Sequence, residues 1–408
     1  MQISRRHIQN YGYFGIEQMT LSIKLDMLLI KSTVLLLELD QESQVSTVLK
    51  MALKRFMVVD SRKGNEWYSI FLNYGVLFSM KGAPVHTERK HKLSHVYSNS
   101  FVQASEALTE ILRNITYNRF IPRMRVWAET GTPVDIHQEN KALFMDLTSA
   151  YLFGLKNSSS FMDGPDKKLV LRNFELSLGG LFWRLDVPNL TKWMGCFGMS
   201  PLDEGIASAS QVMEDFVLSM ANRARDTLQS EDANEIDSYP TVYGQLRQKL
   251  ETSETVSAEQ IYTVVAAEML DHIAASYEGL SITVSYLMTE LARHTSFISR
   301  LQKELLSVNL DTTPSQQIDS LPLLNTILMK TLRLYPAGLG AFTRQVPEKG
   351  AMIGKYSIPG SVTVSLSAYT LHRNSDEFPD PLKWNPDRWL DASPEAKKTN
   401  ATMALGFW

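Results

Sequence analysis

Cysteine is nearly absent from this sequence, and its scarcity sets the first limits on the protein. The 408 residues contain a single cysteine, Cys196. A disulfide framework within the chain is therefore excluded, and a reducing compartment is the natural setting. A chain of this length can bury enough surface to fold without cross-links, as one large domain or two ordinary ones. A lone cysteine is most often a small buried apolar residue, and we expect that here.

The sequence also lacks a charge excess and a long apolar run. Its 41 basic and 44 acidic residues form no long blocks of one sign, which gives no reason to expect nucleic acid or an anionic membrane surface as a partner. The most apolar early stretch, residues 27–39, is interrupted by Lys31 and is too short to span a bilayer. Nothing at the N-terminus resembles a cleavable signal. We therefore expect a cytoplasmic or peripheral protein without a spanning segment.

What the sequence does contain is mostly helical patterning. Apolar residues recur at helical spacing over residues 93–112 and 141–155, and Pro122 and Pro133 mark breaks between such segments. Aromatic residues and methionine are plentiful, with 17 Phe, 15 Tyr, 7 Trp and 18 Met. This abundance would suit an apolar substrate, but a plain helical core produces the same composition, and the composition alone favours the core.

The longest helix is expected in the second half of the chain. Residues 258–306 contain very few helix breakers and predict a long helix that is parted near His294. Residues 252–254 are candidates for its N-terminal cap. Residues 321–335 predict a further helix, which Pro336 stops.

Two polar stretches, residues 156–170 and 312–320, predict loops between these helices. Residues 338–368 show a different pattern, because apolar and polar residues alternate there between Gly and Pro. That alternation predicts short strands and hairpins. The pattern therefore predicts a mainly α fold with a small β region late in the chain.

Four stretches carry the most specific signals, and the last two are the most distinctive. They read HTERKHKLSHVYS over 86–98, EMLDHIAASYEGLSITVSYLMTELARH over 268–294, LPLLNTILMKTLRLYPAG over 321–338 and FPDPLKWNPDRWL over 378–390. In this order and at this spacing they resemble the cytochrome P-450 family in its fungal form.

The resemblance implies a cytochrome P-450-like domain over residues 66–408, after a poorly matched segment over residues 1–65. Members of that family are haem-thiolate monooxygenases, which insert one oxygen atom into a lipophilic molecule and receive electrons from an NADPH-dependent reductase. They are usually anchored on the endoplasmic reticulum membrane. The implied role for a fungal member is the oxidation of a lipophilic small molecule in secondary metabolism.

The resemblance also nominates residues that would contact the haem propionates. His86 and Lys90 fall where the family has a tryptophan and an arginine, one helical turn apart and hence on one face. Arg344 and His372 fall near positions that can face the propionates. No metal ligand is expected among the residues of this sequence.

The central helix of the family carries an acid followed by a threonine that helps to deliver protons to bound oxygen. Here the acid is Glu278, but the threonine position is Gly279, which has no hydroxyl. Glycine also weakens a helix by roughly 1 kcal/mol relative to alanine. The small residue of the motif is Ser276, and bulky Tyr277 follows it.

A second departure lies in the family's Glu-x-x-Arg motif. A buried glutamate there normally sits between two arginines and ties its helix to the following meander. In this sequence the glutamate position is Lys330, while the arginines are present as Arg333 and Arg388. Three cations replace a compensated cluster, and breaking a buried pair typically costs about 3–5 kcal/mol. We therefore expect a loosened meander.

A third departure concerns the haem ligand itself. The family's cysteine lies in the signature Phe-x-x-Gly-x-x-x-Cys-x-Gly, and residues 403–408 resemble its beginning. From this resemblance we expect the chain to lack the cysteine loop and the following helix. We do not expect Cys196 to replace the thiolate, nor His272 to serve as a ligand, because lone residues of these types are usually structural.

Three interpretations remain open at this stage. The one we favour is a catalytically inactive member, in which haem binding is doubtful. The second is an active monooxygenase whose sequence is represented here in incomplete or mis-spliced form. The third is a non-catalytic protein that binds a hydrophobic ligand or a protein partner.

Overall fold

The computed structural model describes residues 83–390, except for short gaps. These gaps are 165–166, 178–182, 184–187, 203–204, 231–238, 240, 253–256, 309–320, 338–341, 347, 354–355 and 367. The domain boundary expected at residue 65, the polar loop expected over 312–320 and the signature-like stretch over 403–408 lie outside the described residues.

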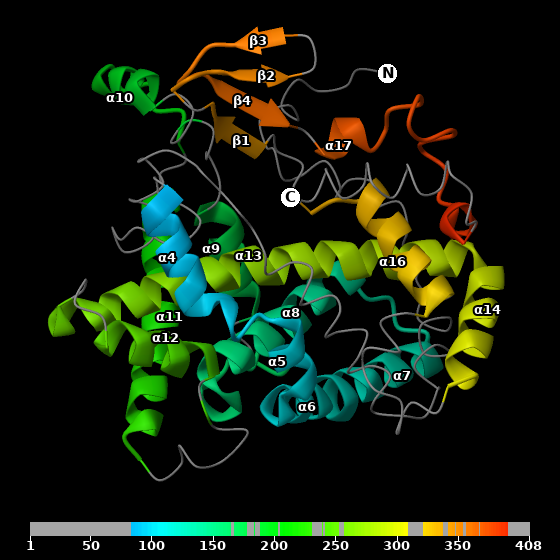
Figure 1. The fold of residues 1–408 in the computed structure, drawn as a ribbon. Coiled ribbons are helices and arrows are strands. Elements are labelled where there is room, and N and C mark those ends of the chain that lie inside the picture. Colours follow the sequence, from blue (N-terminus) through cyan, green and yellow to red (C-terminus); the bar gives the residue numbers. More distant parts are fainter. Residues whose placement is uncertain are drawn as a thin grey trace.

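Helices dominate the described residues and confirm the mainly α prediction (Figure 1). Their bounds are α4 Ala83–Ser94, α5 Asn99–Ala104, α6 Glu106–Leu112, the π-helix η4 Arg113–Phe120, α7 Ile121–Thr130, α8 Ile136–Phe153, the 3₁₀ helix η5 Leu155–Asn157, α9 Lys167–Ser177, α10 Pro188–Cys196, α11 Gly205–Leu228, α12 Thr241–Glu251, α13 Ala258–Arg293, α14 Thr295–Leu306, α16 Pro322–Leu334, α17 Ala368–Leu371 and the 3₁₀ helix η8 Pro386–Trp389. No helix in this described part is long and apolar enough to cross a bilayer.

The long helix α13 is the axis of the fold and runs across the whole molecule in Figure 1. It ends where predicted, at His294, whose backbone leaves the helical region with φ −125° and ψ 63° before α14 begins. The expected cap at 252–254 is wrong, because Ser257 occupies the N-cap position. Helix α16 ends at Leu334, two residues before Pro336, as predicted.

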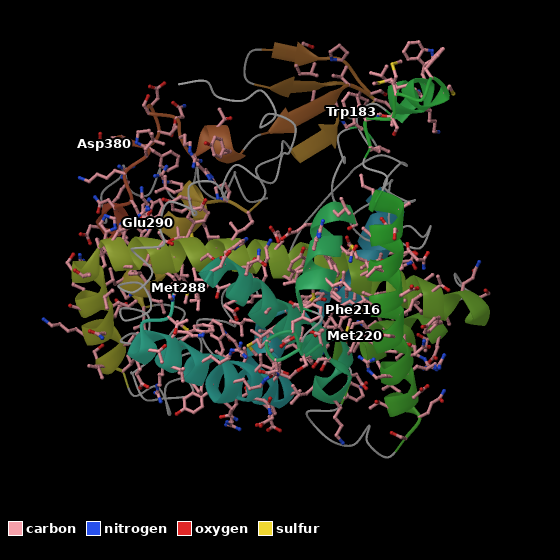
Figure 2. The ribbon with its side chains drawn as sticks, turned by 180° about the vertical axis from the view of Figure 1, so that it is seen from behind. Trp183, Phe216, Met220, Met288, Glu290 and Asp380 are labelled. Carbon is pink, nitrogen blue, oxygen red and sulfur yellow. The ribbon has the colours of Figure 1, made fainter. Side chains whose placement is uncertain are left out.

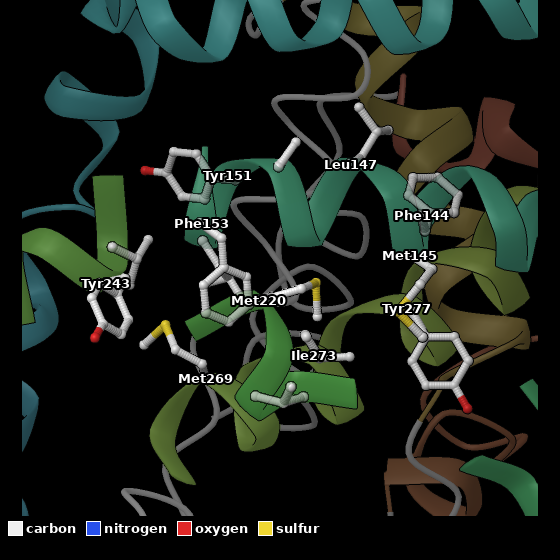
Figure 3. Packing of buried hydrophobic residues seen from close by; sticks show 14 of the residues in the cluster. Phe144, Met145, Leu147, Tyr151, Phe153, Met220, Tyr243, Met269, Ile273 and Tyr277 are labelled. Atoms are coloured by element: carbon white, nitrogen blue, oxygen red, sulfur yellow. The ribbon is translucent and has the colours of Figure 1, made fainter. Parts of the chain in front are cut away.

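Helix α8 packs along α13 and is itself buried over almost its whole surface. Side chains from the two helices interdigitate with those of α11 and α12 in one large apolar core (Figure 3). Phe153, Met220, Tyr243 and Met269 meet there from four different helices. Full burial of each such side chain contributes about 1.5–3 kcal/mol.

The single helix expected over residues 93–112 is instead three helices, α4, α5 and α6. Ser98 and Ser105 interrupt it, because each adopts an extended backbone and caps the next helix. Their side-chain oxygens accept hydrogen bonds from the N–H groups of Phe101 and Leu108. Apolar periodicity continues through both breaks, which is why the pattern alone suggested one helix.

Proline and loop predictions were only partly correct. Pro122 lies in the first turn of α7, where its missing N–H is not needed, so it begins a helix. Pro133 lies in the link between α7 and α8, as predicted. Within the polar stretch 156–170, residues 158–164 are irregular, but α9 begins at Lys167.

The late β region is confirmed as two small antiparallel pairs above α13 (Figure 1). Strand β1 (Phe342–Gln345) pairs with β4 (Thr363–Leu366), and β2 (Ala351–Ile353) pairs with β3 (Tyr356–Ile358). Gly360 lies against the carbonyl of Glu348, and a Cβ at Gly360 would come within 2.0 Å of that oxygen. A side chain is therefore excluded at this turn.

A second apolar cluster joins α14, α16 and the meander, which we define as residues 378–390. Glu304 of α14 caps α16 from outside, since its carboxylate accepts from the N–H groups of Leu323 and Leu324 at 2.7 and 2.8 Å. Trp384 of the meander stacks on His294, with ring centroids 5.0 Å apart. The meander is thus anchored to both helices.

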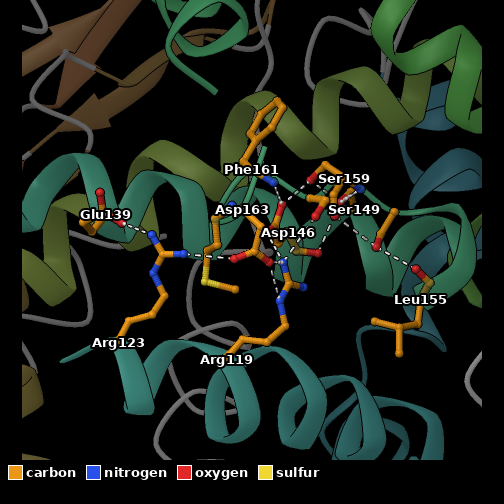
Figure 4. Close-up of polar contacts among 12 residues, drawn as sticks. Arg119, Arg123, Glu139, Asp146, Ser149, Leu155, Ser159, Phe161 and Asp163 are labelled. Carbon is orange, nitrogen blue, oxygen red and sulfur yellow. Dashed lines mark hydrogen bonds and ion pairs between the residues drawn. The ribbon is translucent and has the colours of Figure 1, made fainter. Parts of the chain in front are cut away.

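Asp146 of α8 organises the turn that follows this helix (Figure 4). Its carboxylate accepts from the hydroxyl of Ser159 at 2.6 Å and from the N–H groups of Phe161 and Met162 at 2.6 and 3.1 Å. Arg119 approaches the same carboxylate at 3.4 Å. Burial raises the pKa of Asp146 despite these donors, so the carboxylate depends on them.

Replacing Asp146 by asparagine therefore tests how strongly this turn is held. We expect Asp146→Asn to lower the free energy of unfolding by about 3 kcal/mol, because buried donors lose a charged acceptor. Urea unfolding measures the change. The matched control is Asp163→Asn, whose carboxylate is 54% exposed and pairs with Arg119 and Arg123. It should cost less than about 1 kcal/mol, and equal losses in the two variants would contradict the interpretation.

Candidate functional site

The acid of the central helix, Glu278, is held by a lysine from the neighbouring helix. Lys141 of α8 is 1% exposed, and its Nζ lies 3.2 Å from Glu278 and 2.7 Å from Glu175 of α9. Burial raises the pKa of Glu278, and the charge of Lys141 opposes that rise. The ion pair therefore joins α8, α9 and α13 at the point where the sequence predicts proton chemistry.

Lys141 and Glu175 were not predicted as members of this site. Their only signal in the sequence is one lysine at the start of the apolar run KALFMDLTSAYLF, residues 141–153. A lysine inside a helix buried on all sides must find a carboxylate, since an unpaired buried charge is too costly. The sequence alone could not identify which carboxylate it would be.

The serine and threonine hydroxyl groups around Gly279 are directed into their own helix. Ser276 donates to the carbonyl of His272 at 2.6 Å, Ser281 to that of Glu278 at 2.9 Å and Thr283 to that of Gly279 at 3.0 Å. Such hydrogen bonds are the usual choice of Ser and Thr inside helices. None of these three hydroxyls replaces the one that is missing at Gly279.

The structure brings Lys330, Arg333 and Arg388 together where α16 meets the meander, and we call these three residues the cationic junction. Lys330 is 0% exposed. Within the described part of the chain, its Nζ has no hydrogen-bond partner and lies 5.7 Å from the centre of the Trp389 ring. The missing glutamate is therefore not replaced by another acceptor at Lys330.

The two arginines of the cationic junction bind main-chain carbonyls instead of a carboxylate. Arg333 donates to the carbonyls of His372 and Pro381, the latter at 2.5 Å, and Arg388 donates to that of Pro379. Arg333 Nε and Arg388 Nη1 are buried and have no partner among the described residues. Each guanidinium thus keeps part of its hydrogen-bonding capacity unused.

Electrostatics at the cationic junction follow from this arrangement. Burial, reinforced by the charges of Arg333 and Arg388, lowers the pKa of Lys330 to about 6, with only Glu290 acting in the opposite direction. Burial and the charge of Arg388 lower the pKa of Arg333 to about 9. At neutral pH the cluster therefore sheds charge, mainly from Lys330.

The meander keeps its place through contacts that do not involve Lys330. Arg300 of α14 binds Asp387 with two hydrogen bonds of 2.9 and 2.6 Å, and the indole N–H of Trp384 donates to Thr331 at 3.3 Å. These contacts hold residues 384–387 against α14 and α16. The expected loosening of the meander remains a prediction for measurements of local opening.

Of the four residues nominated for haem propionates, the structure describes the side chains of Lys90 and His372, which lie on separate elements. Lys90 is exposed on α4, while His372 is buried directly after α17, with its ring 6.2 Å from that of Phe378. Figure 1 shows α4 and α17 over different parts of α13. The side chains of His86 on α4 and of Arg344 on β1 lie outside the described part of the structure.

The two residues weighed as axial ligands of haem iron, Cys196 and His272, lie in different settings. Cys196 is exposed at the end of α10, beside the small strands in Figure 1, so its expected burial is wrong. His272 accepts or donates a 2.5 Å hydrogen bond at Nδ1 with the hydroxyl of Tyr97, and burial lowers its pKa to about 4. The exposed Cys196 on α10 therefore does not form a haem-thiolate site at α13.

The pKa of Lys330 predicts how stability depends on pH. Between about pH 6, its folded pKa, and its ordinary value of 10.5, the unfolded chain binds a proton that the folded chain does not. Stability should therefore rise with pH in this window. We expect the urea midpoint to increase from about pH 6 to about pH 9, and Lys330→Met to flatten this increase. An unchanged slope in the variant would exclude Lys330 as its source.

Restoring an acid at this position should stabilise the protein. In Lys330→Glu, a carboxylate would accept from Arg333 Nε and Arg388 Nη1, and we expect a gain of about 3 kcal/mol in the free energy of unfolding. Lys303→Glu is the control, because it makes the same charge change on an exposed residue of α14. A loss of stability in Lys330→Glu, or an equal gain in both, would contradict this expectation.

Comparison with known proteins places the chain among named relatives. The family model of cytochrome P-450 matches residues 35–407. The cytochrome P-450 monooxygenase avaI of Aspergillus versicolor is 26% identical over 357 residues, which are 85% of this chain and 80% of that protein. The cytochrome P-450 monooxygenase orf2 of Aspergillus niger is 34% identical over 135 residues, 33% of this chain and 27% of that protein. Mitochondrial cytochrome P-450 11B1 of Rattus norvegicus is 29% identical over 174 residues, 41% of this chain and 34% of that protein.

The match to the family model extends over most of the chain and includes the central helix, the cationic junction and the meander. The mainly helical fold with a small late β region agrees with it. On these grounds the chain belongs to the cytochrome P-450 family.

Proposed function

We propose that this chain is a member of the cytochrome P-450 family that does not itself carry out monooxygenation. The observation that carries the proposal is the buried Lys330. At the position of the family's structural glutamate, it leaves two arginines without a shared carboxylate and adds a buried amine. The helix and meander that frame the family's haem pocket are therefore joined by a different set of contacts.

The central helix supports the same proposal by a separate route. Delivery of protons along this helix needs an acid that exchanges protons and a hydroxyl that passes them on. Glu278 is fixed by the Lys141 ion pair, Gly279 has no hydroxyl, and the neighbouring hydroxyls donate to carbonyls of their own helix. The helix keeps its shape but lacks a side chain that could relay a proton beyond Glu278.

The ligand set is the third line of support. The only cysteine of the sequence is Cys196, which is exposed on α10. When bound in this family, haem supplies oxygen activation that depends on a cysteine thiolate as axial ligand. Cys196 is not placed to provide that thiolate next to α13.

The second candidate function is an active monooxygenase that oxidises a lipophilic small molecule with electrons from an NADPH-dependent reductase. The similarity to the monooxygenase avaI along 85% of this chain favours it, as does the retention of Glu278. The similarity to fungal monooxygenases favours secondary metabolism as the context of such an activity. Under this alternative, the departures at Gly279 and Lys330 would be tolerated.

Haem reconstitution distinguishes the two candidates. We expect the purified chain, incubated with haem, reduced and exposed to carbon monoxide, to give no thiolate-type Soret band, because no described cysteine lies beside α13. The monooxygenase avaI, prepared in the same way, serves as the positive control. A thiolate-type band from this chain would overturn the proposal and favour the active enzyme.

A double variant distinguishes loss of the haem ligand from loss of folding stability. Gly279→Thr combined with Lys330→Glu restores the family residues at both positions. We expect this double variant to be more stable than the parent chain and still to show no thiolate-type band. If the band appeared in the double variant alone, the defect would lie in these two positions rather than in the ligand.

A further inference from the structure

The cationic junction contains hydrogen-bond donors that nothing in the described chain uses. Lys330 Nζ, Arg333 Nε and Arg388 Nη1 are all buried, and each lacks an acceptor among the described residues. They belong to three basic side chains at one contact between α16 and the meander. A buried donor without an acceptor typically costs about 1–3 kcal/mol, and more when it is charged.

The acids that the structure describes in the vicinity are already engaged elsewhere. Glu290 of α13 accepts from the hydroxyl of Tyr335 at 2.5 Å and pairs with Arg293 at 3.3 Å. Figure 2 shows Glu290 on α13 and Asp380 apart from it, in the meander. Asp387 is held by both guanidinium nitrogens of Arg300.

The remaining charged groups that act on the junction do not compensate it. Asp380 is exposed and raises the pKa of Arg388 only against a larger effect of burial. Arg373 adds a further positive charge that lowers the pKa of Arg333. The junction is therefore a buried site with an excess of positive charge and with three donors available.

We propose that the cationic junction binds one small monovalent anion, such as chloride or formate, which accepts hydrogen bonds from Lys330, Arg333 and Arg388. The proposal does not depend on haem or on the proposed function. The dissolved anion would occupy the place that the carboxylate of a glutamate at position 330 would take.

The surroundings of the junction indicate which anions it would select. Lys330 Nζ faces the ring of Trp389, and the guanidinium of Arg333 lies 4.8 Å from the centre of the Phe378 ring. These aromatic walls cannot replace the hydration shell of a doubly charged anion, so sulfate would lose more on entry than chloride. Arg388 is only partly buried and provides the side from which an anion enters.

Anion binding should be linked to the charge of Lys330. The anion favours the protonated amine, and the pKa of Lys330 without it is lowered to about 6. Above about pH 6, the Lys330 amine must therefore take up a proton when the anion binds. The affinity of the junction for the anion should increase as the pH falls. Ordinary salt screening has no such dependence on a single amine.

Thermal unfolding at constant ionic strength tests the proposal. Chloride is raised from about 10 mM to about 300 mM while gluconate, a larger organic anion, is lowered to match. We expect Tm to increase by roughly 3 °C at pH 6 and by less at about pH 8, because the anion binds only the folded state. Formate should act like chloride. A Tm that follows ionic strength alone, whichever anion is present, would overturn the proposal.

Two variants assign the effect to the junction. Lys330→Glu carries its own carboxylate and should lose the chloride dependence, whereas Lys303→Glu, with the same charge change on the surface, should keep it. Persistence of the full chloride effect in Lys330→Glu would exclude this site.

Fluorescence provides a readout that does not require a stable charge variant. Trp389 is buried, so dissolved iodide should not reach its ring by collision, but iodide bound at Lys330 would lie beside it. We expect a saturable component of quenching that chloride competes away and that Trp389→Phe lacks. Purely linear quenching, equal in both proteins, would contradict a bound anion.

Discussion

Packing of α13 against α8 is the interaction on which the rest of the structure depends. Both helices are buried along most of their length, and the helices α9, α11 and α12 complete the core around them. A charge placed inside such a contact must be neutralised there, because water cannot reach it. Lys141 meets this demand with Glu175 and Glu278, so the same ion pair that secures the core also fixes the acid of the central helix.

Lys141 and Lys330, two buried lysines that the structure describes, have very different surroundings. Lys141 has two carboxylates within 3.2 Å, while Lys330 has an aromatic ring and two arginines as its neighbours. The amine of Lys141 is paired with both carboxylates, whereas burial and the two arginines lower the pKa of Lys330 to about 6. Both lysines are buried, so the difference between them lies in the charges that face each amine.

The sequence predicted the extents of the long helices better than their caps and the partners of their side chains. The long helix, its break at His294 and the end of α16 before Pro336 followed from the scarcity of breakers and from proline geometry. The junction of Lys330 with two arginines followed from the resemblance to the cytochrome P-450 family. The local serine caps that divide residues 93–112 were missed because apolar periodicity continues through them. The exposure of Cys196 and the partners of Lys141 could not be predicted because tertiary packing sets them.

Helix α16 is positioned from outside at both of its ends. Glu304 holds its first N–H groups, and Arg373 donates to the carbonyl of Leu334 in its last turn. Its orientation is consequently independent of the residue at position 330 in its middle. A substitution at position 330 would therefore change the contacts with the meander while both ends of α16 stay held. Its consequences fall on the far side of the junction, in how firmly the meander is attached, rather than on the placement of the helix.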